Sequence, residues 1–386
     1  MSSQMLDVFR DLIDRETDGP VLSVFCRTDP RDPANVSETP GWLVALRNGL
    51  RDAAARVEGD HEATEAIRRL SKEAENRLTM ASAHERGRSV ALFLSADGTI
   101  DIFHTFQIPL RDDFVVLEDG IVIWPAMDLL ERGQRTGIVL LSQDQIRLFE
   151  WEDGVVNDLE SSVYNLELGD WRQYRGAGGA GGSGRTVHSA SHVDSYEDRV
   201  HAWRTRFIKD AAGNIAESTK DLKLERLVVV ADPDLSGEFM EALPQGLRER
   251  VVTVVALNLI DATAPDVADH LDEHLRQAWR EQVNEFADHA LARIKAGDRG
   301  AGGPDQVVAA LMEGRVEHVI MDPFFEFDEG DLSNGVREAI TNAGEETARE
   351  AAVEIALRTG AHVSSASVEE VPALAEADGV LALLRY

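Results

Sequence analysis

The sequence predicts a mixed protein of α/β and α+β type with three domains. In the first third, apolar strand-like runs are joined by Asp-Gly pairs, which is the usual signal of a β-hairpin. After residue 135, apolar β-branched runs alternate with helical patterns, as in sheets that are covered by helices. A length of 386 residues suits two or three domains. We place the domains at 1–134, 135–262 and 263–386.

The N-terminal domain is expected to be α+β. Two stretches with apolar residues at helical spacing follow one another with a short join, which predicts an αα-hairpin. The expected elements, in order, are a helix within 1–18, a strand at 21–26, helices from Trp42 to Val57 and from Ala63 to Leu78, and β-hairpins that turn at Asp97-Gly98 and Asp119-Gly120.

The middle domain is expected to hold a mixed sheet, and the C-terminal domain a small α/β/α sandwich. For the middle domain we expect strands at 136–142, on both sides of Asp153-Gly154, at 224–232 and at 250–257, with a helix at 236–243. For the last domain we expect a helix at 265–295, a Gly-Ala-Gly-Gly turn at 300–303, a helix from Pro304, a strand at 316–322, a helix at 344–359, a strand at 360–367, a short helix at 369–377 and a final strand at 379–386.

Composition limits the classes of function. The net charge of −31 argues against a protein that coats nucleic acid with its whole surface. No run of 18 apolar residues occurs and the N-terminus is acidic, so we expect neither a membrane span nor a secretory signal. The single cysteine, Cys26, lies in an apolar strand and is expected to be a buried structural thiol. The protein is expected to be cytoplasmic.

Residues 171–209 form the most unusual segment, which we call the basic glycine stretch. Six of the nine residues in 176–184 are glycine, so neither a helix nor a strand forms there cheaply. The stretch holds seven Lys/Arg and three Asp/Glu, a charge of +4, so the rest of the chain carries −35. One basic island in an acidic protein indicates where a polyanion would bind.

The flanks of the glycines favour a functional loop over an inter-domain linker, which is the alternative. Trp171, Arg172, Tyr174 and Arg175 precede the glycines, and an amphipathic helix is expected after them. A linker needs neither of these flanks. The apolar positions of the expected helix are Val193, Tyr196, Val200, Trp203, Phe207 and Ala211.

Three phrases of the last domain carry a resemblance to a known family. They are AALMEGRVEHVIMD, RTGAHVSSAS and the closing GVLALLRY. This part resembles the C-terminal domain of archaeo-eukaryotic class 1 release factors and Pelota, which has the ribosomal-protein L7Ae/L30e-like fold. The middle part looks like the ribonuclease-H-like central domain of that family, whose exposed glycine loop enters the peptidyl-transferase centre. The phrase HSASHVDSYEDR resembles the segment after that loop in the bacterial Vms1-like branch.

The resemblance implies a function in translation. A protein of this family would act as a monomer on the ribosome, rRNA and peptidyl-tRNA, hydrolysing the peptidyl-tRNA ester in ribosome rescue. A translational GTPase would bind through the C-terminal domain, and no cofactor or membrane would take part. The loop and ribosome-binding residues would be Gly176, Gly178, Gly179, Gly181, Gly182, Gly184, Arg172, Tyr174, Arg175, Arg185, Arg199, Arg204 and Arg206.

One departure from the family concerns catalysis. Family members that release peptide carry a glutamine beside the glycines, whereas this sequence has none between Gln173 and Gln245. Ser183, His188 and His192 are the candidate catalytic groups, since a histidine can orient water or act as a base. The alternative is that both histidines only line the base of the loop.

Three functions therefore remain open. The first is a release-factor-like peptidyl-tRNA hydrolase. The second is a non-catalytic ribosome-binding factor of the same architecture, for hibernation or rescue, which the missing glutamine favours. The third is an acidic multi-domain adaptor whose glycines form only a linker.

Other groups of polar residues favour structural roles. His270 and His274 have a spacing that metals accept, but no third ligand is evident and we expect no metal site. Asp232 and Asp234 are expected to form a turn after a strand, and the acidic run 326–331 a solvated loop. No nucleotide-binding motif is present.

Overall fold

The structure is a computed structural model that describes residues 4–13, 15, 17–165, 190–323, 332–343 and 348–386. Internal contacts divide the chain into two compact units: Met1–Gln134 with Trp279–Tyr386, and Arg135–Ala278. The described residues form three sheets with helices, so the expected mixed α/β class is confirmed. The finer division into three domains stays a prediction. None of the helices in these ranges is long and apolar enough to cross a bilayer.

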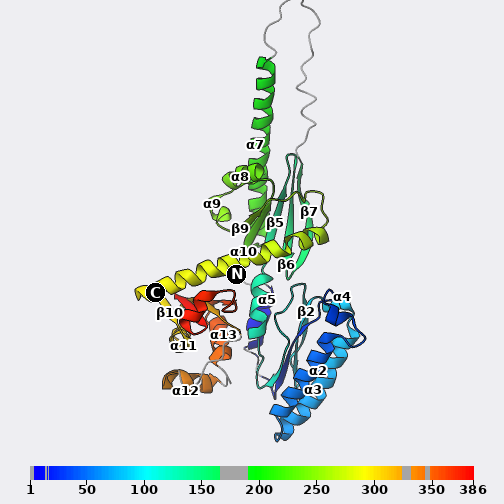
Figure 1. Ribbon diagram of the computed structural model, residues 1–386, viewed down its shortest axis with the longest axis vertical. Coiled ribbons are helices and arrows are strands. Elements are labelled where there is room, and N and C mark those ends of the chain that lie inside the picture. Colours follow the sequence, from blue (N-terminus) through cyan, green and yellow to red (C-terminus); the bar gives the residue numbers. More distant parts are fainter. Residues whose placement is uncertain (1–3, 14, 16, 166–189, 324–331, 344–347) are drawn as a thin grey trace, which may run out of the picture. The chain divides into compact units, whose positions relative to one another are not determined.

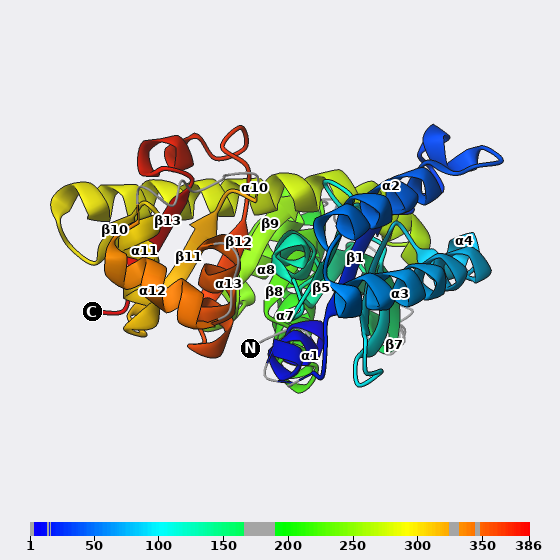
Figure 2. The same cartoon turned by 90° about the horizontal axis from the view of Figure 1, so that it is seen from below.

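The N-terminal part of the first unit is a four-stranded antiparallel sheet with the order β3-β2-β1-β4. Helices α2 and α3 cover one face of the sheet (Figure 2). Leu46, Leu70 and Leu78 of these helices are buried among strand residues. The elements are α1 (Gln4–Ile13), β1 (Val21–Arg27), η1 (Pro33–Val36), α2 (Gly41–Arg56), α3 (His61–Met80), α4 (Ala83–Arg86), β2 (Ser89–Ser95), β3 (Asp101–Phe106), β4 (Phe114–Glu118), η2 (Trp124–Ala126) and α5 (Met127–Arg132).

The αα-hairpin expected in this part is confirmed. Asp60 caps α3, because its carboxylate accepts hydrogen bonds from the backbone N–H groups of Glu62 (2.9 Å) and Ala63 (3.1 Å). Gly59 takes a φ of 112°, which a residue with a side chain adopts only at a cost. The cap and the glycine together fix the turn between the two helices.

The two expected β-hairpins have different outcomes. The hairpin that turns at Asp97-Gly98 joins β2 to β3. Hydrogen bonds from the Ser95 hydroxyl and from backbone N–H groups hold the pKa of Asp97 far below its usual range. The prediction of a hairpin at Asp119-Gly120 is wrong. After β4 the chain leaves the sheet, the Val122 N–H donates to Ser23 Oγ at 3.0 Å, and the apolar residues that suggested a strand pack inside.

The C-terminal part of the first unit is a four-stranded sheet with the order β10-β13-β11-β12, in which only the β11–β12 pair is parallel. Val319 and Ile320 are adjacent in β11 and both are buried, so both faces of the sheet are covered (Figure 2). The elements are the end of α10 (Ala264–Ala296), then β10 (Gly300–Gly302), α11 (Pro304–Met312), β11 (Val316–Met321), α12 (Asn334–Ala343), α13 (Ala348–Arg358), β12 (His362–Ser365), η4 (Pro372–Ala377) and β13 (Val380–Leu384).

The expected turn at 300–303 is instead mainly the edge strand β10. Gly300, Ala301 and Gly302 pair with β13. A Cβ on Gly300 would lie 2.7 Å from the backbone nitrogen of Ile294. Glycine therefore allows the two backbones to approach closely here. The sequence pattern did not distinguish this use of glycine from a turn.

The second unit is a five-stranded mixed sheet with the order β7-β6-β5-β8-β9 (Figure 1). Strands β5 and β8 are parallel neighbours and almost wholly buried, which explains their continuous apolar sequences. The elements are β5 (Thr136–Leu141), β6 (Gln145–Glu152), β7 (Val155–Asn165), α7 (Ala190–Asp221), β8 (Arg226–Val230), α8 (Pro233–Ala242), α9 (Gln245–Arg248), β9 (Val251–Val255) and the start of α10.

The core of the second unit yields a prediction on stability. Ile215 of α7 is fully buried among residues of the sheet and of α8. We expect Ile215→Ala to lower the free energy of unfolding of this unit by about 2–5 kcal/mol, through lost burial and a residual cavity. Val254→Ala, at a partly exposed position of the edge strand β9, is the control and should change it by less than about 0.5 kcal/mol. Urea unfolding followed by tryptophan fluorescence measures both; equal effects would contradict the observed packing of α7.

The single thiol yields a second prediction. Cys26 is fully buried in β1, and burial, followed by the nearby charge of Asp113, raises the pKa of its thiol. A thiol with a raised pKa forms little of the reactive thiolate. We expect a disulfide reagent to leave the native protein unlabelled and to label one thiol after unfolding in urea, with Cys26→Ala as the blank. Rapid labelling of the native protein would show that β1 opens readily.

Candidate functional site

In the chain, strand β7 precedes the predicted loop and helix α7 follows it. The helix is fixed to the sheet by Ile208, Ala211, Ala212 and Ile215, which are buried together with residues of β5, β6 and β8. Farther along, the Thr219 hydroxyl donates to the backbone oxygen of Ile215 at 2.7 Å and is satisfied inside the core. The second half of α7 is therefore a rigid support.

The buried face of α7 differs in part from the predicted apolar face. Ala211 is buried and Phe207 packs against the core, as expected, but Trp203 is 38% exposed. The stripe that packs runs through Ile208 and Ile215 instead. Both stripes have helical spacing, and only the fold decides which one meets the sheet. Trp203, within the basic glycine stretch, is therefore partly open to solvent.

The two predicted arginines that the structure describes with their side chains have different roles. The Arg204 guanidinium donates to both carboxylate oxygens of Glu238 on α8, at 2.7 and 3.2 Å, and so ties α7 to α8. Arg206 is 84% exposed at its side chain, and its nearest ion-pair contact, to Asp210, is 3.8 Å long. Arg206 therefore fits a phosphate contact better than Arg204 does.

The side chains of the other residues of the predicted site lie outside the part of the chain that the structure describes. His192 and Arg199 belong to α7, but only their backbone is described. The residues that lie wholly outside the described ranges are Arg172, Tyr174, Arg175, Gly176, Gly178, Gly179, Gly181, Gly182, Ser183, Gly184, Arg185 and His188. Their roles stay predictions.

Two alternative sites weighed from sequence have local roles here. Asp232 caps α8 by accepting hydrogen bonds from the backbone N–H groups of Asp234 and Leu235, as a turn after a strand would require. His270 donates from Nδ1 to the backbone oxygen of Asp266 at 2.7 Å, within its own helix. Among the residues with described side chains, one group that could hold a metal ion is Glu131, His318 and His362, in the first unit.

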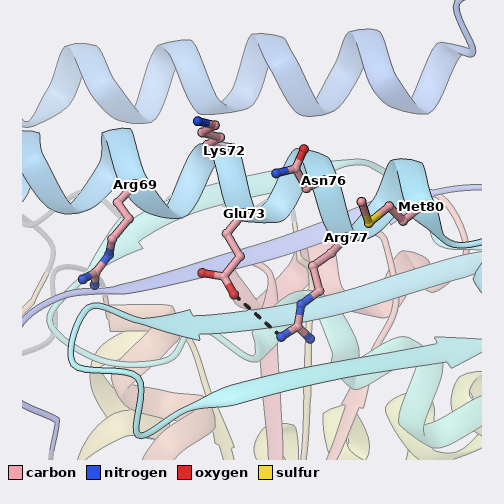
Figure 3. Close-up of a pocket in the computed structure, with 6 residues that line it drawn as sticks. All are labelled: Arg69, Lys72, Glu73, Asn76, Arg77 and Met80. Carbon is pink, nitrogen blue, oxygen red and sulfur yellow. Dashed lines mark ion pairs between the residues drawn. The ribbon is translucent and has the colours of Figure 1, made fainter.

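A surface hollow on α3 is lined by three cationic side chains and one carboxylate (Figure 3). Arg77 pairs with Glu73 at 3.7 Å and also with Asp101 of β3, while Arg69 donates to the backbone oxygen of Ala96. Its remaining lining residues are Lys72, Asn76 and Met80. Two of the three cationic side chains, Arg69 and Arg77, are thus engaged in contacts within the protein.

One comparison with known proteins finds a family match for the segment that contains the basic glycine stretch. Residues 123–276 match the family model of bacterial archaeo-eukaryotic release factor family 10. Curated proteins give no match. The match extends from η2 through the whole of α7 to the first half of α10.

Solved structures of translation factors are also similar in part. Archaeal translation termination factor aRF1 is 16% identical over 100% of this chain and 99% of its own, with a TM-score of 0.26. Dom34 of S. cerevisiae, a translation termination-like factor, is 10% identical over 77% and 84%, with a TM-score of 0.39. A ribosome-bound archaeal Pelota is 13% identical over 100% and 95%, also with a TM-score of 0.39. At these TM-scores the whole chains do not superpose, so the assignment rests on the family match. The resemblance to the release-factor and Pelota superfamily is thereby confirmed, with residues 123–276 matching the model of its bacterial family 10.

Proposed function

We propose that this protein is a release-factor-like protein that binds ribosomal particles and presents the basic glycine stretch to the peptidyl-transferase centre. The observation that carries the proposal is the family match over 123–276, because that segment contains the stretch and the helix that supports it. The charge distribution agrees with it: +4 in residues 171–209 against −35 elsewhere leaves one region suited to RNA phosphates.

Glycine suits the chemistry of this proposed site. A backbone without Cβ enters a crowded RNA pocket, and its N–H groups can stabilise the oxyanion that develops on an ester. The arginines before and after the glycines would contact phosphates, while Tyr174 and Trp203 would stack on bases. The firmly packed half of α7 would hold the loop in position during contact.

Hydrolysis of peptidyl-tRNA also requires that a water molecule be placed against the ester carbon. Without a glutamine in 174–244, this task would fall to Ser183, His188, His192 or the RNA itself. General acid–base help from a placed side chain is worth roughly 10²- to 10⁴-fold in rate. We therefore propose a slow peptidyl-tRNA hydrolase.

A second function of the same architecture is a non-catalytic ribosome-binding factor, for hibernation or rescue. The absence of the loop glutamine favours it. In either case the rRNA and the peptidyl-tRNA would be the macromolecules in contact with the loop, and we propose that a translational GTPase would bind the C-terminal sheet region. The remaining alternative, an acidic adaptor with a glycine linker, predicts no ribosome binding at all.

The role of the basic glycine stretch is tested by charge reversal. We expect Arg172→Glu, Arg175→Glu and Arg185→Glu together to weaken binding to ribosomal particles strongly. They should also flatten its salt dependence, because each lost phosphate contact removes released counterions. Co-sedimentation between about 50 and 200 mM salt measures both.

The matched control reverses three exposed arginines of α2 and α3, Arg51, Arg56 and Arg68, and so changes the net charge equally. The control should keep the parent's affinity and salt slope. If both triple variants bind alike, total charge rather than the stretch governs association. If neither they nor the parent binds, the adaptor function is favoured.

The catalytic proposal is tested on stalled large subunits that carry peptidyl-tRNA. We expect slow release by the parent, slower release by His188→Ala with His192→Ala, and faster release by Ser183→Gln. Alanine at Gly178, Gly179, Gly181 and Gly182 should stop the loop from seating and abolish release. Rapid release that is unaffected by the two histidine changes would show that the catalytic group lies elsewhere. Binding without any release of peptide would support the non-catalytic function.

A further inference from the structure

A cluster of metal-ligating residue types lies in the first unit, away from the basic glycine stretch. His318 of β11 and His362 of β12 are register partners across the parallel pair of strands. Side chains two residues apart in a strand share a face, so His318 lies on the face of Ile320, which packs beneath α10. Glu131, from α5, meets the two histidines there.

The contacts bring the three side chains to one point. Ser364, two residues after His362, donates from Oγ to Glu131 Oε1 at 2.7 Å and accepts from His318 Nε2 at 2.7 Å. His362 Nε2 lies 3.6 Å from the same Glu131 oxygen. One ligand atom from each of Glu131, His318 and His362 lies within 4.8 Å of the others.

The surroundings hold this arrangement in place. The ring of Phe286 on α10 stacks on His318 with centroids 3.7 Å apart, and the two histidine rings meet edge to face at 4.4 Å. The Glu131 side chain is only 4% exposed, and Ser364 is fully buried. The His362 side chain is 41% exposed, so the cluster is open to solvent on one side. An ion and a water molecule could enter there.

The donor set selects the ligand. Two imidazoles and one carboxylate suit Zn²⁺, which binds three such ligands and a water molecule in a tetrahedral arrangement. Mg²⁺ and Ca²⁺ prefer oxygen ligands in larger number. A hydrogen bond from a buried hydroxyl to the ligating carboxylate, as Ser364 provides to Glu131, is the usual support of a metal site.

We propose that Glu131, His318 and His362 bind one Zn²⁺ ion, with Ser364 as a positioning residue. The ion would link α5 to strands β11 and β12 within the first unit. This site is independent of the proposed function on the ribosome. No sequence pattern indicates the site, because the three residues are far apart in the chain and show no ligand spacing.

The test uses tag-free full-length protein, stripped with a chelator and titrated with ZnCl₂ by calorimetry and by equilibrium dialysis with metal analysis. We expect one ion per chain and a rise in the melting temperature, because an ion that binds only the folded state stabilises it. His362→Ala should abolish both. Ser364→Ala should weaken binding by about 10- to 100-fold, as changes to supporting groups typically do.

The control changes the exposed pair on α10, with His270→Ala and His274→Ala together, and should keep the site intact. His362 is partly exposed, so its variant should fold, which its melting temperature without metal confirms. Glu131→Gln, which keeps the shape of the side chain, gives a second, independent loss of binding. The proposal is overturned if the parent binds no Zn²⁺, or if binding survives His362→Ala and disappears in the α10 variant.

Discussion

The packing of α7 against the buried strands of the five-stranded sheet is the interaction on which the proposed activity depends. Strands β5 and β8 form a parallel, apolar centre, and Ile208, Ala212 and Ile215 fix the helix to it. Arg204 then ties the same helix to α8 through Glu238. A loop that reaches into RNA, as proposed, would need such a support, because the free-energy cost of ordering the loop is lower when its ends are fixed.

The first unit depends on a different kind of interaction, a set of partly buried polar contacts. Arg111 bridges Asp128 of α5 and Glu370, which lies just before η4, and its guanidinium lies over the ring of Trp279. Removing one partner from an ion pair that is partly withdrawn from water leaves the other charge poorly solvated, so such pairs favour one arrangement of the elements they join. The pair of contacts from Glu131 to Ser364 and His362 lies in the same part of the unit. A bound metal ion there would reinforce a link that the ion pairs already make.

The sequence predicted most of the elements because their signals are local. A few neighbouring residues determine each of the continuous apolar strands, the Asp60 cap and the Asp97-Gly98 turn. It failed where tertiary contacts decide. Apolar residues after Asp119-Gly120 pack inside instead of pairing, and Gly300–Gly302 pairs with β13 instead of turning. The exposure of Trp203 and the meeting of His318 with His362 likewise follow from how distant segments pack, which no local pattern records.

The most direct test of the central claim is an electron cryo-microscopy structure of the full chain bound to large ribosomal subunits that carry peptidyl-tRNA. The proposed function predicts residues 176–184 at the ester end of the tRNA in the peptidyl-transferase centre. The arginines on both sides should lie against rRNA phosphates, and α7 should keep its packing on the sheet. A complex in which this segment faces solvent, with the protein bound through another surface, would contradict it.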